Sequence, residues 1–116
     1  RVYYKMTNKI IDLSKDYSNY PAGRYRKDSN YSGERFREEL LITALRENDT
    51  VTIILDNLDG VGASFWDEAF GGLIRDGKFS KEELEKKLIL ECKDDIYLVG
   101  YIKSFINEVY SINNSR

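Results

Sequence analysis

Apolar positions along this chain follow two periods, and the clearest signal is a short apolar run followed by a helical stripe. Residues 51–55 (VTIIL) form a run typical of a strand buried on both faces. From residue 64 to residue 74, apolar side chains recur every three to four positions, which predicts a helix with one wide apolar face. Ser64 is the expected N-cap, with Asp67 as the acidic arm of a capping box. The stripe consists of Phe65, Trp66, Ala69, Phe70, Leu73 and Ile74.

The same patterns predict the remaining elements. One helix is expected at about residues 33–46, capped by Ser32, and another at 81–87, opened by a capping box at Ser80. A last helix is expected to start at Asp94, with Ile96, Val99, Ile102, Phe105, Ile106, Val109 and Tyr110 on its apolar face. Further strands are expected at 9–13, 23–27 and 88–92.

Helices that alternate with apolar strands predict the α/β class, with a mostly parallel mixed sheet of about four strands and helices packed on it. The strands at 9–13 and 23–27 are the candidates for an antiparallel pair at one end of that sheet. Gly71 and Gly72 lie inside a predicted helix, where each costs up to about 1 kcal/mol relative to alanine. Either a partner approaches them closely, or they only let the helix pack on its own sheet.

Composition narrows the functional classes. With 116 residues the chain is expected to form one domain over residues 6–116, and residues 1–5 are read as a fusion remnant or upstream segment. A net charge of −2 gives no bulk attraction to nucleic acid or to an anionic membrane. Histidine is absent and Cys92 is the only cysteine, so no internal disulfide or cysteine–histidine metal cluster is expected. The expected compartment is the cytoplasm, and no cofactor is expected.

Four acidic residues are predicted to lie near the C-terminal end of the strand at 51–55. Asp56, Asp59, Asp67 and Glu68 provide the oxygen ligands that Mg²⁺ prefers. The alternative is local: the first two shape the loop, Asp67 caps the helix and Glu68 is solvated. Both interpretations are open at this point, and the local one is favoured because acids at such positions are common.

A second set of polar residues is basic. Arg24, Arg26 and Arg37 lie near the helix start at Ser32 and Gly33, where free backbone amides and guanidinium groups can bind a phosphate or a carboxylate. The spacing of a P-loop is absent. The alternative is an N-cap with ion pairs to neighbouring glutamates.

Three segments carry a resemblance to a known family. They are GRYRKD at 23–28, SGERFRE at 32–38 and SFWDEAFGGL at 64–73. From Met6 onward the chain resembles the STAS-like family of unknown function (the DUF4325 type), which is distantly similar to the STAS domains of anti-sigma-factor antagonists. In STAS domains an aspartate and a phosphorylatable serine begin the helix after the third strand. By this resemblance Asp67 matches the aspartate and Glu68 takes the place of the serine.

The resemblance implies a non-enzymatic regulatory or protein-interaction domain, whose partner would be a histidine-kinase-like ATPase regulator or a similar protein. A homodimer is left open. The partner-binding residues would be Asp59, Gly60, Ser64, Trp66, Asp67, Glu68 and Gly71. Because Glu68 cannot be phosphorylated and Ser64 is expected to be engaged as an N-cap, no phosphorylation switch is expected here. The alternative function is a small nucleotide- or Mg-binding enzyme that uses the acidic loop 56–68 and the arginine cluster 24–37.

Overall fold

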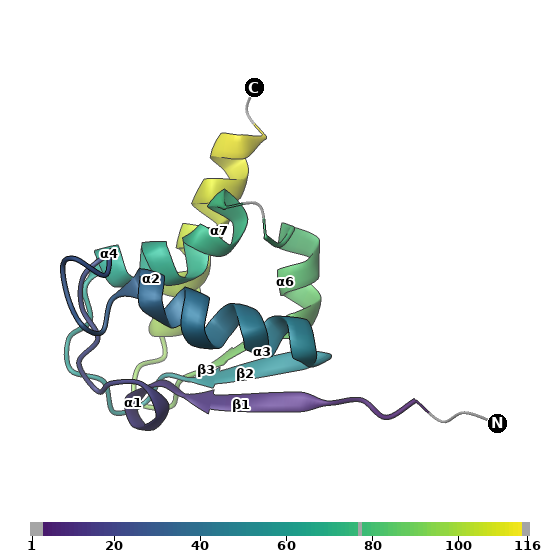
Figure 1. The fold of residues 1–116 in the computed structure, drawn as a ribbon, viewed down its shortest axis with the longest axis horizontal. Coiled ribbons are helices and arrows are strands. Elements are labelled where there is room, and N and C mark those ends of the chain that lie inside the picture. The colour runs from purple at the N-terminus through teal and green to yellow at the C-terminus, as the bar shows by residue number, and fades with distance from the viewer. Residues whose placement is uncertain (1–3, 77, 115–116) are drawn as a thin grey trace.

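A computed structural model describes residues 4–76 and 78–114 (Figure 1). Within them, three strands form one parallel sheet in the order β1-β2-β3. The strands are β1 (Asn8–Asp12), β2 (Thr50–Ile54) and β3 (Leu88–Glu91). The α/β class and the parallel sheet are confirmed, but the sheet has three strands where about four were expected. Residues 1–3 of the expected N-terminal remnant lie outside the described part.

The prediction of a strand at residues 23–27 was wrong. Gly23 has a φ of +85°, a left-handed conformation that interrupts an extended strand. A turn follows, in which the Asp28 amide donates to the Tyr25 carbonyl at 2.8 Å. The segment instead lies along the start of a helix, where Gly33 N–H donates to Gly23 O at 3.0 Å. The expected antiparallel pair is therefore absent from the described residues.

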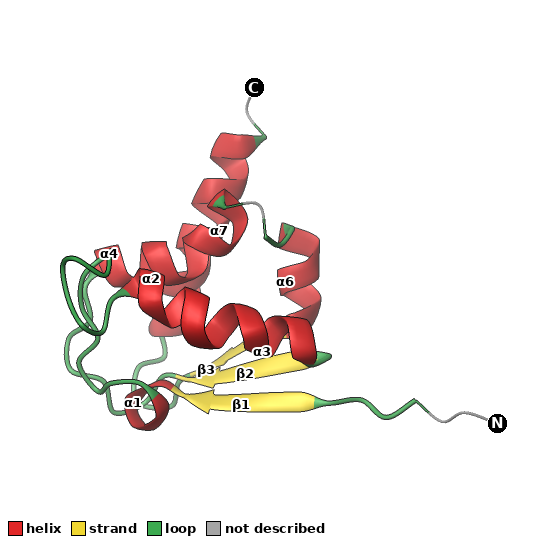
Figure 2. Cartoon of the chain, in the orientation of Figure 1, coloured by secondary structure: helices red, strands yellow, loops and turns green. Residues whose placement is uncertain are grey.

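The long helices cover one face of the sheet (Figure 2). Residues 33–47 form one continuous helix with a π-helical turn in its middle, and so do residues 63–75. The helical segments are α1 (Leu13–Asp16), α2 (Gly33–Phe36), η1 (Arg37–Leu41), α3 (Ile42–Glu47), α4 (Ala63–Trp66), η2 (Asp67–Gly71), α5 (Gly72–Arg75), α6 (Lys81–Lys87) and α7 (Leu98–Asn113). Here η1 and η2 are the π-helical turns.

The helix starts agree with the sequence at two of three expected caps. Ser32 accepts a hydrogen bond from Arg35 N–H, and Ser80 forms the full capping box with Glu83. The N-cap expected at Ser64 was wrong, because α4 begins at Ala63 after Gly62. Ser64 lies in the first turn with its side chain exposed.

The core lies between the sheet and the helices. Val51 and Ile53 of β2 are fully buried, and the expected buried face of the second long helix is confirmed by Phe65, Ala69 and Leu73. On the opposite face of the sheet, Ile10, Thr52 and Ile89 lie in one register row, and the two isoleucines on the edge strands are exposed. Other fully buried apolar side chains include Leu13, Phe36, Leu41, Leu45, Leu55, Trp66, Phe70 and Ile102.

Gly33 lies against the backbone of the second long helix, and its replacement is expected to destabilise the fold. A Cβ atom there would lie 2.7 Å from the carbonyl oxygen of Phe65 and 3.0 Å from the amide nitrogen of Ala69. Since backbone atoms must move to make room, we expect Gly33→Ala to cost about 1–3 kcal/mol of unfolding free energy in urea titrations. The control is Gly100→Ala in α7, where no atom beyond the neighbouring residues and the helix's own backbone lies within 4 Å of the added methyl.

We expect Gly100→Ala to stabilise by roughly 0.5–1 kcal/mol, because alanine favours the helix and restricts the unfolded chain. If Gly33→Ala lowers the free energy of unfolding and Gly100→Ala raises it, the close contact at Gly33 is supported. A neutral Gly33→Ala would show that the helices separate without cost.

Candidate functional site

The loop between β2 and α4 lies at the carboxyl end of the parallel sheet, the usual place for a site in α/β proteins. Asn57 has a φ of 65°, so the chain turns sharply directly after Asp56. The Asp59 amide donates to the Asn19 carbonyl at 2.8 Å, which ties the loop to the segment after α1. Asp59 and Gly60 themselves are exposed to solvent.

Hydrogen bonds of Asp56 join this loop to the loop after β3. Its Oδ1 accepts hydrogen bonds from the amides of Lys93 at 2.7 Å and Asp94 at 2.9 Å, and these bonds lower the pKa of Asp56. In return, Asp94 Oδ2 accepts from the Asn57 amide at 2.9 Å. Asp94 was expected to start the last helix, but that helix begins at Leu98. The two loops therefore act as one unit.

The four carboxylates predicted to converge on Mg²⁺ do not meet. Within the described residues, the group whose ligand atoms lie within 4.8 Å of one another is Asp56, Cys92 and Asp94. Burial, followed by the hydrogen bond to Asp94, raises the pKa of the Cys92 thiol to about 11. The thiol is protonated near neutral pH, and both carboxylates already accept backbone hydrogen bonds. This group is therefore better suited to joining the loops after β2 and β3 than to binding a cation.

The raised pKa predicts that Cys92 is unreactive. At pH 8 the thiolate fraction should be on the order of a hundred times smaller than that of a free cysteine with a pKa of about 8.5. We therefore expect iodoacetamide to alkylate the folded protein roughly a hundredfold more slowly than the protein in concentrated urea, as followed by intact mass. Cys92 is the only cysteine, so the mass change reports it alone. Equal rates in the two states would contradict the assignment.

Asp67 and Glu68 of the acidic set and Arg24 and Arg37 of the basic set, which were predicted separately, meet in one network. Its six members come from the loop before α2, from both long helices and from the residue after α5. We call it the arginine–carboxylate network: Arg24, Arg37, Arg75, Asp67, Glu68 and Asp76.

Arg37 and Glu68 are the buried centre of the network. Their side chains are only 3% and 8% exposed, and Arg37 Nη1 lies 2.8 Å from Glu68 Oε2. Arg37 also donates to the Glu68 backbone carbonyl and lies 3.0 Å from Asp76. Its Nε is buried without a hydrogen-bond partner among the described residues. Glu68 was expected to be solvated, and this was wrong.

The position of Arg37 in its pair with Glu68 also explains why residue 72 is a glycine. The Arg37 guanidinium occupies the space that a Cβ on Gly72 would fill. At Gly71, an added Cβ would lie 2.8 Å from Asp67 Oδ1 and 3.1 Å from Val109 of α7. Both glycines therefore accommodate neighbours within the chain. The structure favours internal packing over close approach of a partner at this point.

Asp67 links the outer arginines. It accepts from Arg24 at 2.6 Å and from Arg75 at 2.7 Å, so it does not act as the arm of a capping box. Ser32 and Gly33, the helix start predicted to bind an anion, are both buried. Arg26 lies apart from the network and pairs with Glu38 and Glu39.

The structure divides the predicted partner surface in two. Asp59, Gly60 and Ser64 are exposed, and Asp67 is half-buried. The other predicted members, Trp66, Glu68 and Gly71, are buried. Substitution of Glu68 would therefore test the core pair rather than a contact with a partner.

Three exposed apolar side chains beside the loop were missed by the sequence reading. Ile96 and Tyr97 are 76% and 79% exposed, and Tyr101 is also exposed. Ile96 was expected on the buried face of the last helix, but it lies in the turn before α7 and is not constrained by the helical period. Tyr101 lines a hollow of about 250 Å³ together with Leu58, Gly60, Val61, Asp94 and Asp95.

A helix-covered parallel sheet, with a loop–helix site at its carboxyl end, defines the class as a small α/β domain. A family model described as the STAS-like domain of unknown function (DUF4325) matches residues 32–94, and the chain belongs to this family. The family resemblance noted from the sequence is thereby confirmed over residues 32–94, a range that leaves out the segment at 23–28. The comparisons matched no curated protein and no solved structure to this chain. None of the described helices combines the length and apolarity needed to cross a membrane.

Proposed function

We propose that this domain is a non-enzymatic regulatory module that binds a protein partner. The observation that carries the proposal is the cluster of exposed apolar side chains next to the loop after β2. Its residues are Ile96, Tyr97, Tyr101, Asp59, Asp94 and Asp95, and we call it the loop surface. Adjacent exposed apolar side chains with a polar rim are typical of protein interaction sites.

Tyr97 and Tyr101 supply the anchors. Tyrosine buries a large area with few rotatable bonds and is enriched among the residues that dominate binding energy. Tyr101 is braced by an edge-to-face contact with Phe105, with ring centroids 5.0 Å apart. The hollow between Tyr101 and the loop offers space for one apolar side chain of a partner.

The rim of the loop surface is acidic. Asp59, Asp94 and Asp95 are exposed, and Lys93 is the one basic residue within the exposed stretch 93–97. A partner should therefore present basic residues around an apolar side chain, which would favour association and fix its orientation. Membership of a STAS-like family supports a histidine-kinase-like ATPase regulator as the class of partner, by similarity to anti-sigma-factor antagonists.

The alternative, a nucleotide- or Mg-binding enzyme, is less well supported. Arg24, Arg37 and Arg75 are matched by carboxylates of the arginine–carboxylate network, so their charges are not free to hold phosphates. The acidic residues of the loop 56–68 contact different groups of the domain: Asp56 accepts hydrogen bonds from backbone amides, whereas Asp67 and Glu68 pair with arginines. A site for phosphoryl chemistry would need these groups to converge on one point.

The proposal is tested by site-specific photo-crosslinking in the native host. A photoreactive phenylalanine analogue at position 97 should capture one discrete protein, and the same analogue at Tyr4, which is exposed before β1 at the opposite end of the sheet, should not. With the captured protein purified, we expect Tyr97→Ala to weaken binding by about thirtyfold or more, as for an interface hot spot, and Tyr4→Ala to leave it unchanged.

A parallel titration with nucleotides and Mg²⁺ separates the alternative. Micromolar binding that Arg24→Ala or Asp56→Ala abolishes would overturn the proposal in favour of the enzyme. Equal capture at positions 97 and 4 would also overturn it, since the partner would then show no preference for the loop surface.

A further inference from the structure

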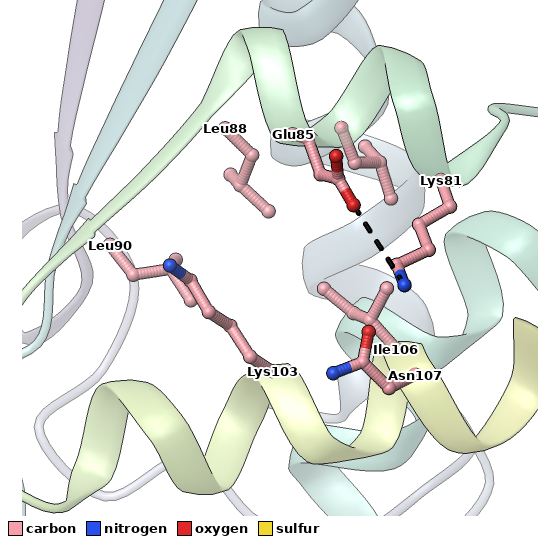
Figure 3. Close-up of a pocket in the computed structure, with 8 residues that line it drawn as sticks. Lys81, Glu85, Leu88, Leu90, Lys103, Ile106 and Asn107 are labelled. Carbon is pink, nitrogen blue, oxygen red and sulfur yellow. Dashed lines mark ion pairs between the residues drawn. The ribbon is translucent and has the colours of Figure 1, made fainter.

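A second hollow lies on another part of the domain, between α6, β3 and α7 (Figure 3). Its volume is about 300 Å³, and it shares no lining residue with the hollow at the loop surface. Four aliphatic side chains line its interior, each at most 9% exposed: Leu84, Leu88, Leu90 and Ile106. They come from all three elements, so the hollow is apolar where it is deepest.

The mouth of this hollow is basic and polar. Lys81 of α6 and Lys103 of α7 lie on opposite sides, and Asn107 is one helical turn after Lys103 (Figure 3). Glu85 is the one acid in the lining, and its oxygen is 3.8 Å from Lys81 Nζ. Lys81 also lies over the Tyr110 ring, 4.7 Å from its centroid. No ion pair engages Lys103 among the described residues.

We propose that this hollow binds a small apolar molecule that carries one carboxylate. Its size is at the lower end of ligand pockets, which span roughly 300–1,000 Å³ and are mostly apolar with a few placed polar groups. The aliphatic interior takes the apolar part of the ligand. The ammonium of Lys103 holds the carboxylate at the mouth, where Asn107 offers a further polar group. Two lysines against one glutamate give the mouth a net positive charge, which selects an acid over an amine.

The aliphatic part of Lys103 contributes as well. In Figure 3 its side chain extends from α7 toward the β3 side of the hollow, where Leu88 and Leu90 lie. Long basic side chains commonly lay their methylenes along apolar surface while the charged end stays in water. Lys103 can therefore close over the apolar part of a ligand while its charge meets the carboxylate.

Octanoate titrated into the isotope-labelled full chain tests the proposal, with amide shifts followed by NMR. We expect saturable shifts that are concentrated on Leu84, Leu88–Leu90 and Lys103–Asn107. Octylammonium, of equal chain length and opposite charge, should bind at least tenfold more weakly. Each methylene removed from the acid should weaken binding by about fourfold while the chain still occupies the interior.

Two charge reversals complete the test. Lys103→Glu should weaken octanoate binding by about tenfold, since an attraction becomes a repulsion. Lys86→Glu makes the same charge change on an exposed residue of α6 outside the lining, and should leave binding within twofold. Equal effects of the two variants, equal binding of acid and amine, or shifts that never saturate would overturn the proposal. A response to an acidic peptide without one to octanoate would also overturn it, and would indicate a protein-docking groove.

Discussion

Replacing Arg37 with alanine is expected to destabilise the domain by about 3–5 kcal/mol, because Glu68 would keep a buried charge without its partner. Both side chains are almost completely buried, and Arg37 also contacts Asp76 and the Glu68 carbonyl. Urea unfolding, followed by the fluorescence of the single tryptophan Trp66, measures the loss. The effect should exceed that of any exposed ion pair, where median contributions are about 0–1 kcal/mol.

Two matched variants show whether the cost comes from the unpaired charge. Arg26→Ala breaks the exposed pairs with Glu38 and Glu39 and should leave the urea midpoint almost unchanged. The double variant Arg37→Leu/Glu68→Leu removes both charges and should recover most of the loss, since apolar replacements of buried pairs are often neutral. A double variant as unstable as Arg37→Ala would show that packing around the guanidinium, not charge, is what matters.

This network was beyond the reach of the sequence for a physical reason. Arg37 and Glu68 are separated by 31 residues, and Arg24 and Asp67 by 43, so no helical spacing relates them. Arg37 and Glu68 also lie in the π-helical turns η1 and η2. A π-helical turn inserts one residue and redirects the side chains that follow, and no pattern of apolar positions signals it.

The predictable part of the fold is the part in which local pattern and burial agree. The run at 51–55 became β2 because its side chains are the sheet's central apolar residues. The segment at 23–27 alternates just as a strand would, yet it became a loop. Its Arg24 reaches Asp67 on the neighbouring helix, and Gly23 adopts a conformation incompatible with a strand. Alternation without apolar residues to bury is weak evidence for a strand.

The position of the loop after β2 was predicted correctly, but the side chains that surround it were predicted only in part. The loop after β2 is at the sheet's carboxyl end, as the strand–loop–helix order required. Its exposed neighbours Ile96 and Tyr97 were missed because they belong to the connection before α7, which reaches the loop through Asp56 and Asp94. That contact between two loops depends on the parallel pairing of β2 with β3, which is set by the whole sheet.

Phe36→Ala is expected to cost roughly 3–5 kcal/mol, as for a fully buried aromatic side chain. Phe36 has no exposed surface, and its ring centroid lies 5.2 Å from that of Tyr17, 6.1 Å from Phe65 and 6.2 Å from Phe70. It thus joins α2 to the second long helix and to the segment after α1. Removing the ring would leave a cavity at the point where these three segments meet, and urea unfolding should show the loss.

Because domains of this size are stable by only about 5–15 kcal/mol, a milder variant keeps the measurement possible if the alanine variant is largely unfolded. Phe36→Leu conserves much of the volume and should cost about 1–2 kcal/mol. Tyr20→Ala removes an aromatic ring that is mostly exposed, and should change stability by less than about 0.5 kcal/mol. The loss of stability should therefore be largest for Phe36→Ala, smaller for Phe36→Leu and smallest for Tyr20→Ala, and this order follows from burial alone. If Phe36→Ala and Tyr20→Ala unfold at the same urea concentration, Phe36 does not hold the helices together.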